Sequence, residues 1–242
     1  MIACHNLRVK VKRDSNILLG EVAYQAVRDA ISANHMKPGD RLSEYMVADW
    51  LKISRTPARE GLRRLESEGL LTSHPRRGLV VATLDEDAIH ELYSAREVLE
   101  STVAARAARF ATDSEISSLQ HLVEVEATLS DAPEEMFKHN QVFHQLIYRA
   151  ARNRYLLKFL LTISDIMSTH RSVTSLVNPQ RREEVLAEHQ ELAQAIAKRD
   201  EEVARAAAMR HIQGALRARI ATTRRRAMSD EILKQAEISS KA

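Results

Sequence analysis

Three histidines in the second half of the chain occupy positions from which they can converge. Asn140 and His144 are four residues apart, so their side chains project from one face of a helix. His189 and His211 are equally distant from residue 200, and an antiparallel helical hairpin that turns there places them opposite each other. Imidazole nitrogens and an amide oxygen are ligands for a divalent ion, Zn²⁺ first, with Ni²⁺ or Mn²⁺ as alternatives. The competing interpretation is that these histidines are hydrogen-bonded core residues.

Basic residues near the start of the chain point to a different chemistry. Arg55, Arg59 and Arg63 recur every four residues, with Thr56 beside the first, so they lie along one face of a helix. An arginine can donate two hydrogen bonds to guanine O6 and N7, and a threonine can bond a phosphate or touch a thymine methyl group. The spacing predicts a DNA recognition helix. The alternative is that these are solvated surface charges.

Two short helices and a hairpin must position those arginines. Apolar residues at helical spacing predict a helix over 19–32, and a second helix is expected over 43–50. Ser54, at an N-cap position before a proline in the first turn, opens a third helix that ends near Gly69. The segment 70–82, with a basic turn at its tip, predicts the β-hairpin of a winged helix.

The rest of the chain is expected to be helical throughout. Five of the six glycines and three of the five prolines lie in the first 78 residues, so the remainder has few turn-forming residues. Capping residues predict six helices beginning near 85, 113, 133, 154, 179 and 200: Thr83 with Glu86, Thr112 with Glu115, Asp131 with Pro133, Asn153, Asn178 with Pro179, and Asp200. The sixth helix is expected to reach Arg224–Arg226. The fold class is therefore mostly α, a winged helix-turn-helix followed by a six-helix antiparallel bundle.

Charge and composition divide the chain at the same place. Residues 1–84 contain 14 Lys+Arg and 9 Asp+Glu, whereas residues 85–242 contain 22 and 24, so the basic first part favours nucleic acid as a partner. One cysteine excludes a disulfide framework, and no apolar run approaches the ~20 residues that span a bilayer. We expect a cytoplasmic protein with no membrane partner. Its domains are a DNA-binding domain over 1–84 (core 15–83), a helical domain over 85–226 and a C-terminal extension over 227–242.

The first part resembles the winged-helix domain of GntR-type bacterial transcription regulators. The resemblance is carried by Lys37–Glu44, by Ile53–Leu71 and by Arg77-Gly78. It implies that the DNA-contacting residues are Arg55, Thr56 and Arg59, with Ser43 on the backbone and Arg77 and Gly78 in the wing. Two positions depart from the family pattern. Lys52 replaces the glycine of the turn, where a left-handed backbone costs a lysine roughly 1 kcal/mol, and Tyr45 replaces a further arginine.

The second part resembles the FCD effector domain of the FadR subfamily, in its VanR-like branch. Tyr93–Glu100, Asn140–Asn153 and the pair His189 and His211 carry the resemblance. It implies a divalent metal bound by Asp and three His, but here the aspartate position is Asn140, a weaker and neutral ligand. It also implies that Arg96 holds the carboxylate of an effector, with Arg152, Asn153 and Arg171 as further pocket residues. A salt bridge from Arg96 to Glu100 is the alternative.

These resemblances imply a homodimeric repressor that binds a palindromic operator on double-stranded DNA. Its affinity for the operator is expected to change when a small organic acid binds beside the metal. The competing function is a metal-dependent hydrolase with a DNA-binding appendage. The amide at residue 140 argues against the hydrolase, because catalysis needs a carboxylate or a similar base beside the metal. We therefore expect a regulator and no enzymatic activity.

Overall fold

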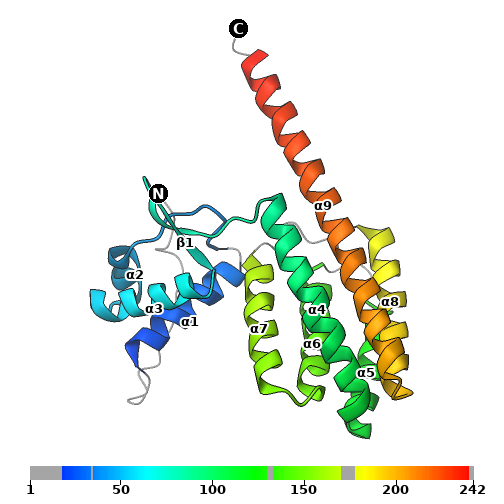
Figure 1. Cartoon of the computed structure of the whole chain (residues 1–242). Coiled ribbons are helices and arrows are strands. Elements are labelled where there is room, and N and C mark those ends of the chain that lie inside the picture. The colour runs from blue at the N-terminus through cyan, green and yellow to red at the C-terminus, as the bar shows by residue number, and fades with distance from the viewer. Residues whose placement is uncertain (1–17, 34, 130–132, 170–177, 240–242) are drawn as a thin grey trace. The chain divides into compact units, whose positions relative to one another are not determined.

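The computed structural model describes residues 18–33, 35–129, 133–169 and 178–239 (Figure 1). They form the elements α1(Leu19–Ser32), α2(Glu44–Leu51), α3(Arg55–Ser67), β1(Leu71–His74), β2(Gly78–Val81), α4(Glu86–Phe110), α5(Asp113–Glu126), α6(Pro133–Ala150), α7(Arg154–Thr169), α8(Pro179–Ala197) and α9(Glu201–Ser239). The fold is thus mostly helical with a small hairpin, as predicted. The expected cap Asp131 and the expected site residue Arg171 lie outside the described residues. Within the part described, no helix is long and apolar enough to cross a membrane.

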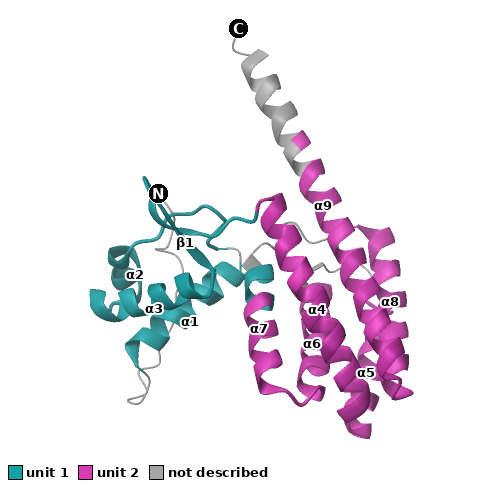
Figure 2. Ribbon diagram, viewed as in Figure 1, with its two compact units in different colours: residues 1–84, 164–172 teal, residues 85–163, 173–242 magenta. Residues whose placement is uncertain are grey.

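The chain divides into two compact units (Figure 2). The first comprises residues 1–84 with 164–172, and the second comprises residues 85–163 with 173–242. Helix α3 packs on α1 in the first unit, because Gly61 brings α3 against the backbone of α1, where an added Cβ would lie 2.7 Å from the amide nitrogen of Tyr24. Val27, Ile31 and Leu65 are fully buried at this contact. The unit therefore holds the outward face of α3 on a rigid apolar core.

Strands β1 and β2 form the predicted hairpin. They pair antiparallel, with Leu71 opposite Val81 and His74 opposite Gly78, so the basic turn lies at the tip. Gly78 has a φ of +72°, a left-handed conformation that glycine adopts without steric cost. Arg41 bridges to Val80 and extends the pairing by one residue on the far side of β2.

The second unit is built from helices α4, α5, α6, α8 and α9 together with the first part of α7. Helix α4 packs along α9, α9 also packs on α8, and α5 and α6 complete the bundle. The capping box of Thr112 with Glu115 and the cap of Asn178 before Pro179 are both present, as predicted. Small side chains such as Ala104, Ala107 and Ala208, each 3% exposed or less, line the buried faces, and they let the helix backbones approach closely.

The predicted cap of α4 was wrong, and two further features differ in detail from the prediction. Helix α4 is capped by Asp85, whose carboxylate accepts from the amide of Ala88, because the chain turns two residues later than a cap at Thr83 requires. Ser54 occupies the N-cap position of α3 but its side chain makes no capping hydrogen bond. The chain after Arg226, expected as an extension, continues α9 to Ser239.

Lys52 adopts the left-handed backbone conformation that was expected to be unfavourable for a lysine. Its φ is +56° and its ψ is 44°, at the C-cap of α2. The ammonium lies 2.9 Å from Asp49 on an exposed surface, where an ion pair contributes little. The turn between α2 and α3 is therefore made by a residue whose Cβ is sterically unfavourable in this conformation.

We predict that Lys52→Gly raises the free energy of unfolding by about 1 kcal/mol, because glycine has no Cβ to clash in this conformation. Urea denaturation followed by circular dichroism measures the change. Lys52→Ala is the matched control, since it removes the ammonium and keeps the steric cost. A glycine variant no more stable than the alanine variant would contradict the explanation.

Candidate functional site

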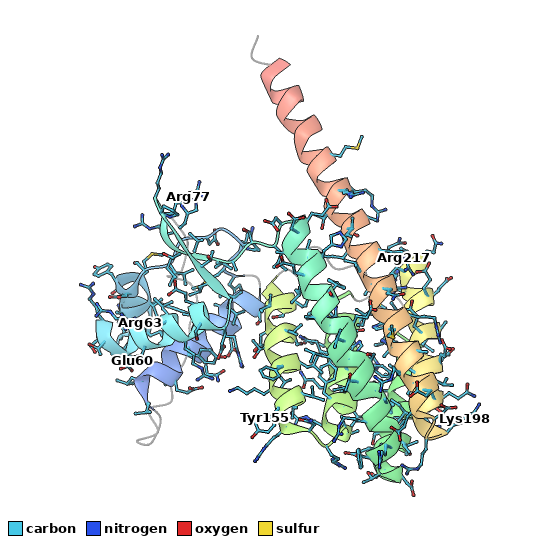
Figure 3. The ribbon with its side chains drawn as sticks, viewed as in Figure 1. Glu60, Arg63, Arg77, Tyr155, Lys198 and Arg217 are labelled. Atoms are coloured by element: carbon cyan, nitrogen blue, oxygen red, sulfur yellow. The ribbon has the colours of Figure 1, made fainter. Side chains whose placement is uncertain are left out.

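The basic face of α3 forms one side of a concave surface in the first unit. Its lining includes Arg55, Arg59 and Arg63 from α3, with Ser43 and Gly78 on its other sides. The three arginines are exposed, as are Thr56 at the start of α3 and Arg77 in the hairpin turn. In Figure 3, Arg63 projects from α3 and Arg77 from the tip of the hairpin. An exposed helix with arginines at successive turns has the shape and charge to enter a major groove.

Glu44 forms hydrogen bonds with two of these arginines, Arg55 and Arg59. The sequence did not predict this contact. The Nε of Arg59 donates to one carboxylate oxygen of Glu44 at 2.6 Å, and Nη2 donates to the other at 3.0 Å. Arg55 donates to the second oxygen at 3.3 Å. Ser43 is engaged as well, because its hydroxyl accepts from the amide of Met46 and caps α2. Tyr45, 71% exposed, lines the same surface.

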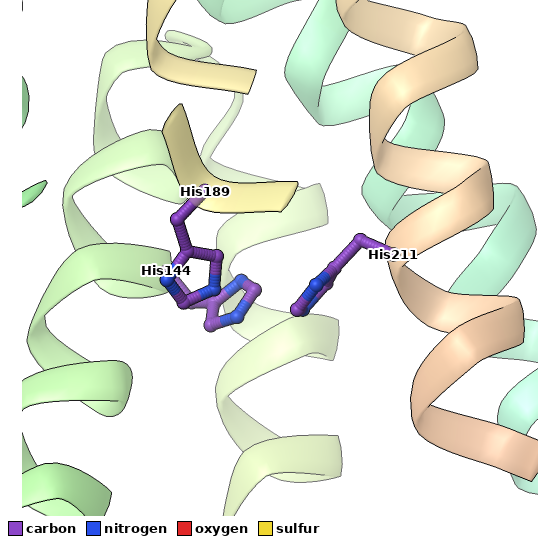
Figure 4. A group of neighbouring side chains, drawn as sticks. All are labelled: His144, His189 and His211. Atoms are coloured by element: carbon purple, nitrogen blue, oxygen red, sulfur yellow. The ribbon is translucent and has the colours of Figure 1, made fainter. Parts of the chain in front are cut away.

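His144, His189 and His211 converge inside the second unit (Figure 4). They come from α6, α8 and α9, and one ligand atom of each lies within 4.8 Å of those of the other two. The ring centroids are 4.9 Å apart for His189 and His211, 5.0 Å for His144 and His211, and 5.3 Å for His144 and His189. All three are buried. The short turn between α8 and α9 places His189 opposite His211, as their equal spacing about residue 200 predicted.

Each histidine has a carboxylate at its Nδ1 atom. His189 Nδ1 is 2.7 Å from Glu126, and His211 Nδ1 is 2.7 Å from Glu188. His144 Nδ1 is 3.3 Å from Glu100. An ionised carboxylate only accepts hydrogen bonds, so in the pairs of His189 and His211 the Nδ1 atom donates and the Nε2 atom is left for another partner. This is the outer arrangement typical of metal-binding histidines.

Two of these glutamates are held in turn by buried arginines. Arg96 donates to Glu100 at 2.7 Å, and Arg181 donates to both oxygens of Glu188 at 2.7 Å. Burial opposes the charge of Glu100, but Arg96 outweighs it and holds the pKa of this carboxyl well below its usual range. Glu126 has no guanidinium or ammonium within 4.0 Å among the described residues. Buried Glu126 therefore has His189 as its charge-neutral partner and no cation beside it in this part of the chain.

The cluster fits a divalent cation on three grounds. Buried His189 has an Nε2 atom with no hydrogen-bond partner, which is costly unless a ligand occupies it. Burial lowers the pKa of His189, and it lowers that of His211 well below its usual value, so both rings are neutral and able to ligate. The carboxylate of Glu126, which has no cationic side chain beside it among the described residues, leaves negative charge for a cation to balance. Phe143 stacks on His189 at 4.1 Å and shields this side from water.

The other predicted site residues of the second unit lie at several positions relative to the histidine cluster. Asn140 lies one turn before His144 on α6 and is partly buried. Arg96 is in the salt bridge with Glu100 that the sequence analysis gave as its alternative. The structure does not bring Arg152 and Asn153 to the histidines, because they form the turn after α6. There Arg152 is paired with Glu115 at 2.7 Å and Asn153 caps α7.

Comparison with known proteins identifies both halves of the chain. The model of the bacterial regulatory proteins of the gntR family matches residues 19–81, and the FCD domain matches residues 91–214. The Nta operon transcriptional regulator of Aminobacter aminovorans is 33% identical over 180 residues, which cover 74% of this chain and 84% of that protein. The chain belongs to the GntR family of regulators with an FCD domain.

Two further proteins are similar to this chain over most of its length. The gluconate operon transcriptional repressor of Bacillus subtilis is 29% identical over 186 residues, covering 74% of this chain and 75% of its own length. The solved structure of Escherichia coli McbR/YncC shares the fold with a TM-score of 0.70 at 23% identity, covering 86% of this chain and 99% of that one. The chain is therefore a DNA-binding transcriptional regulator, and the hydrolase alternative has no support.

The FCD domain of this GntR protein has a close contact that predicts a local effect of mutation. An added Cβ on Gly214 would lie 2.8 Å from Glu188 Oε1 and 3.0 and 3.1 Å from the terminal nitrogens of Arg181. Gly→Ala inside a helix normally stabilises it, but here we expect Gly214→Ala to destabilise the protein by about 1–3 kcal/mol, since both partners are fixed.

The measurement is urea denaturation of Gly214→Ala in two backgrounds. In Glu188→Ala protein the obstructing oxygen is gone, so the penalty of Gly214→Ala should shrink or change sign. An equal penalty in both backgrounds would show that the Arg181–Glu188 pair is not what the new methyl group meets.

Proposed function

We propose that this regulator is a homodimeric repressor whose operator binding responds to a small carboxylate bound beside a divalent metal. The observation that carries the proposal is the histidine cluster with a carboxylate at every Nδ1 atom. His144, His189 and His211 would hold the metal through Nε2, with the amide oxygen of Asn140 as the fourth ligand. Zn²⁺ suits this set best, with Ni²⁺ or Mn²⁺ as alternatives. The six helices from α4 to α9 are consistent with the VanR-like branch.

The polar groups around the cluster support an anion as effector. The four ligands are neutral, Glu100 and Glu188 are paired with the guanidiniums of Arg96 and Arg181, and the cation partner of Glu126 would be the metal itself. A divalent ion held by the histidines would supply a Lewis acid, and a carboxylate group would offset part of its positive charge. The bond to Glu100 uses the Nε of Arg96, and its terminal nitrogens carry further N–H donors for the same ligand.

The effector would act through the equilibrium between arrangements of the dimer. A ligand that binds one arrangement better increases its population, and DNA must alter the effector affinity by the same factor. Two recognition helices must match the spacing of two operator half-sites, so a small change between the protomers changes the affinity. The name of the Bacillus subtilis relative, a repressor, supports repression as the direction.

We predict that Arg59→Ala costs about 1–3 kcal/mol in operator binding and relaxes base preference, because a reading arginine is lost. Arg77→Ala should weaken specific and random DNA more evenly, since it lies at the exposed hairpin tip and contacts phosphates. Fluorescence anisotropy with a duplex selected from a random library by the wild-type protein, and with a scrambled duplex, measures both. Unchanged affinity for the selected duplex in both Arg55→Ala and Arg59→Ala would refute the recognition helix.

We predict that protein purified without chelator contains about one divalent ion per chain, and that His144→Ala, His189→Ala and His211→Ala each remove most of it. Added metal should raise the melting temperature and chelator should reverse the rise. Mass spectrometry of the elements and thermal melting are the measurements. His121→Ala is the matched control, because His121 is exposed on α5.

Asn140→Asp tests the fourth ligand. It should tighten metal retention by adding a charged oxygen, and it should weaken an anionic effector by adding negative charge beside it. A wild-type protein that is free of metal and cannot be loaded would refute the metal site and leave the histidines as core residues.

A further inference from the structure

We propose that Glu44 is a specificity-determining residue of the DNA-binding surface. In this proposal it holds Arg55 and Arg59 in the orientation that reads base edges, and it weakens binding to DNA that lacks the operator sequence. The proposal rests on the assignment of α3 as the recognition helix. It concerns a carboxylate that would not itself bond to DNA, so its effect is on the arginines.

The way Glu44 binds Arg59 leaves one edge of the guanidinium for another partner. Glu44 takes the side edge, where Nε and Nη2 each donate to a carboxylate oxygen at 2.6 and 3.0 Å. A guanidinium has five N–H donors in one plane, so the end edge, formed by Nη1 and Nη2, keeps two parallel donors. Guanine O6 and N7 accept such a pair of hydrogen bonds. The Glu44 contact therefore restricts the rotation of Arg59 without using the donors needed for reading a base.

Glu44 is itself fixed in place. It is the first residue of α2, directly after Ser43, whose hydroxyl caps the helix by accepting from Met46. Its side chain is 28% exposed, against 49% for Arg59 and 67% for Arg55, so it lies deeper in the surface than both. The hydrogen bond from Arg59 lowers the pKa of Glu44, which keeps it ionised. One rigid anion thus orients two otherwise mobile side chains.

The charge of Glu44 also affects random DNA. Non-specific binding depends on arginines and lysines that neutralise phosphates. To turn toward a phosphate, Arg59 must leave Glu44, and the unpaired carboxylate then faces a polyanion. Binding to guanine at the end edge keeps the Glu44 contact and avoids this cost. The arrangement therefore penalises random DNA more than the operator and widens the difference between their affinities.

The experiment compares full-length wild-type protein with Glu44→Gln, Glu44→Asp and Glu66→Gln. The probes are a duplex selected from a random library by the wild-type protein and a scrambled duplex of the same composition. Glu66 is the matched control, because it lines the same surface from α3 and has no ion pair within 4.0 Å among the described side chains. Fluorescence anisotropy at several salt concentrations gives both dissociation constants for each protein.

We expect Glu44→Gln to bind the scrambled duplex about threefold more tightly and the selected duplex more weakly, lowering the ratio of the two affinities at least about tenfold. Glu44→Asp keeps the charge but is one methylene shorter, so it should weaken the selected duplex and leave the scrambled duplex unchanged. Glu66→Gln should strengthen both alike and keep the ratio within about twofold. Melting temperatures within a few degrees of the wild type confirm that α2 is intact.

A ratio for Glu44→Gln within twofold of wild type, in a wild-type protein that selects a defined sequence, would overturn the role of Glu44 alone. So would an equal fall in the ratio for Glu66→Gln, which would attribute the effect to charge in general. A wild-type protein that selects no sequence would overturn the recognition helix and the role of Glu44 together.

Discussion

The hydrogen bond between a glutamate carboxylate and the Nδ1 of a buried histidine is the interaction on which the second unit depends. It occurs at His189 with Glu126 and at His211 with Glu188, each at 2.7 Å, and Glu100 lies 3.3 Å from His144. A buried carboxylate without partners costs several kcal/mol, so His189 is needed to make buried Glu126 tolerable, whereas Glu100 and Glu188 are also paired with Arg96 and Arg181. In return Glu126 fixes the ring of His189 and its tautomer. The three pairs link side chains from five helices, because their partners come from α4, α5, α6, α8 and α9.

The DNA-binding surface follows the same rule in a more exposed setting. There too a glutamate orients nitrogen-bearing side chains, since Glu44 accepts hydrogen bonds from Arg55 and Arg59. In both places the outer partner is an acid on a neighbouring helix, and the group it orients keeps a free face. Preorganisation lowers the entropy that a ligand must offset on binding. In both halves of the chain, a glutamate on a neighbouring helix therefore orients the nitrogen-bearing side chains of the candidate site.

Much of this could be predicted from the sequence, because local signals were strong. Capping residues located the starts of most helices, and equal spacing about residue 200 placed His189 opposite His211. The outer carboxylates were not predicted, apart from Glu100 as a partner of Arg96. Glu126 is 63 residues from His189, and its contact depends on how α5 packs on α8, which no spacing encodes. The contacts of Glu44 with the arginines were not predicted. An acidic residue is common in the first turn of a helix, so its presence at the start of α2 needed no further explanation. The contacts of Arg152 and Asn153 could not be predicted, because they depend on the turn after α6, where Arg152 has a φ of +50°.

Consecutive residues of α8 face two different helices. Glu188 bonds His211 on α9, and His189 bonds Glu126 on α5. Neighbouring positions on a helix are separated by about 100° around its axis. The two hydrogen bonds therefore hold α8 from two different directions. Rolling α8 about its axis would break both at once, whereas tilting or sliding α8 together with its neighbours keeps them. Any motion that the histidine cluster transmits must therefore be a concerted shift of α5, α8 and α9, with no independent rotation of the helix between them.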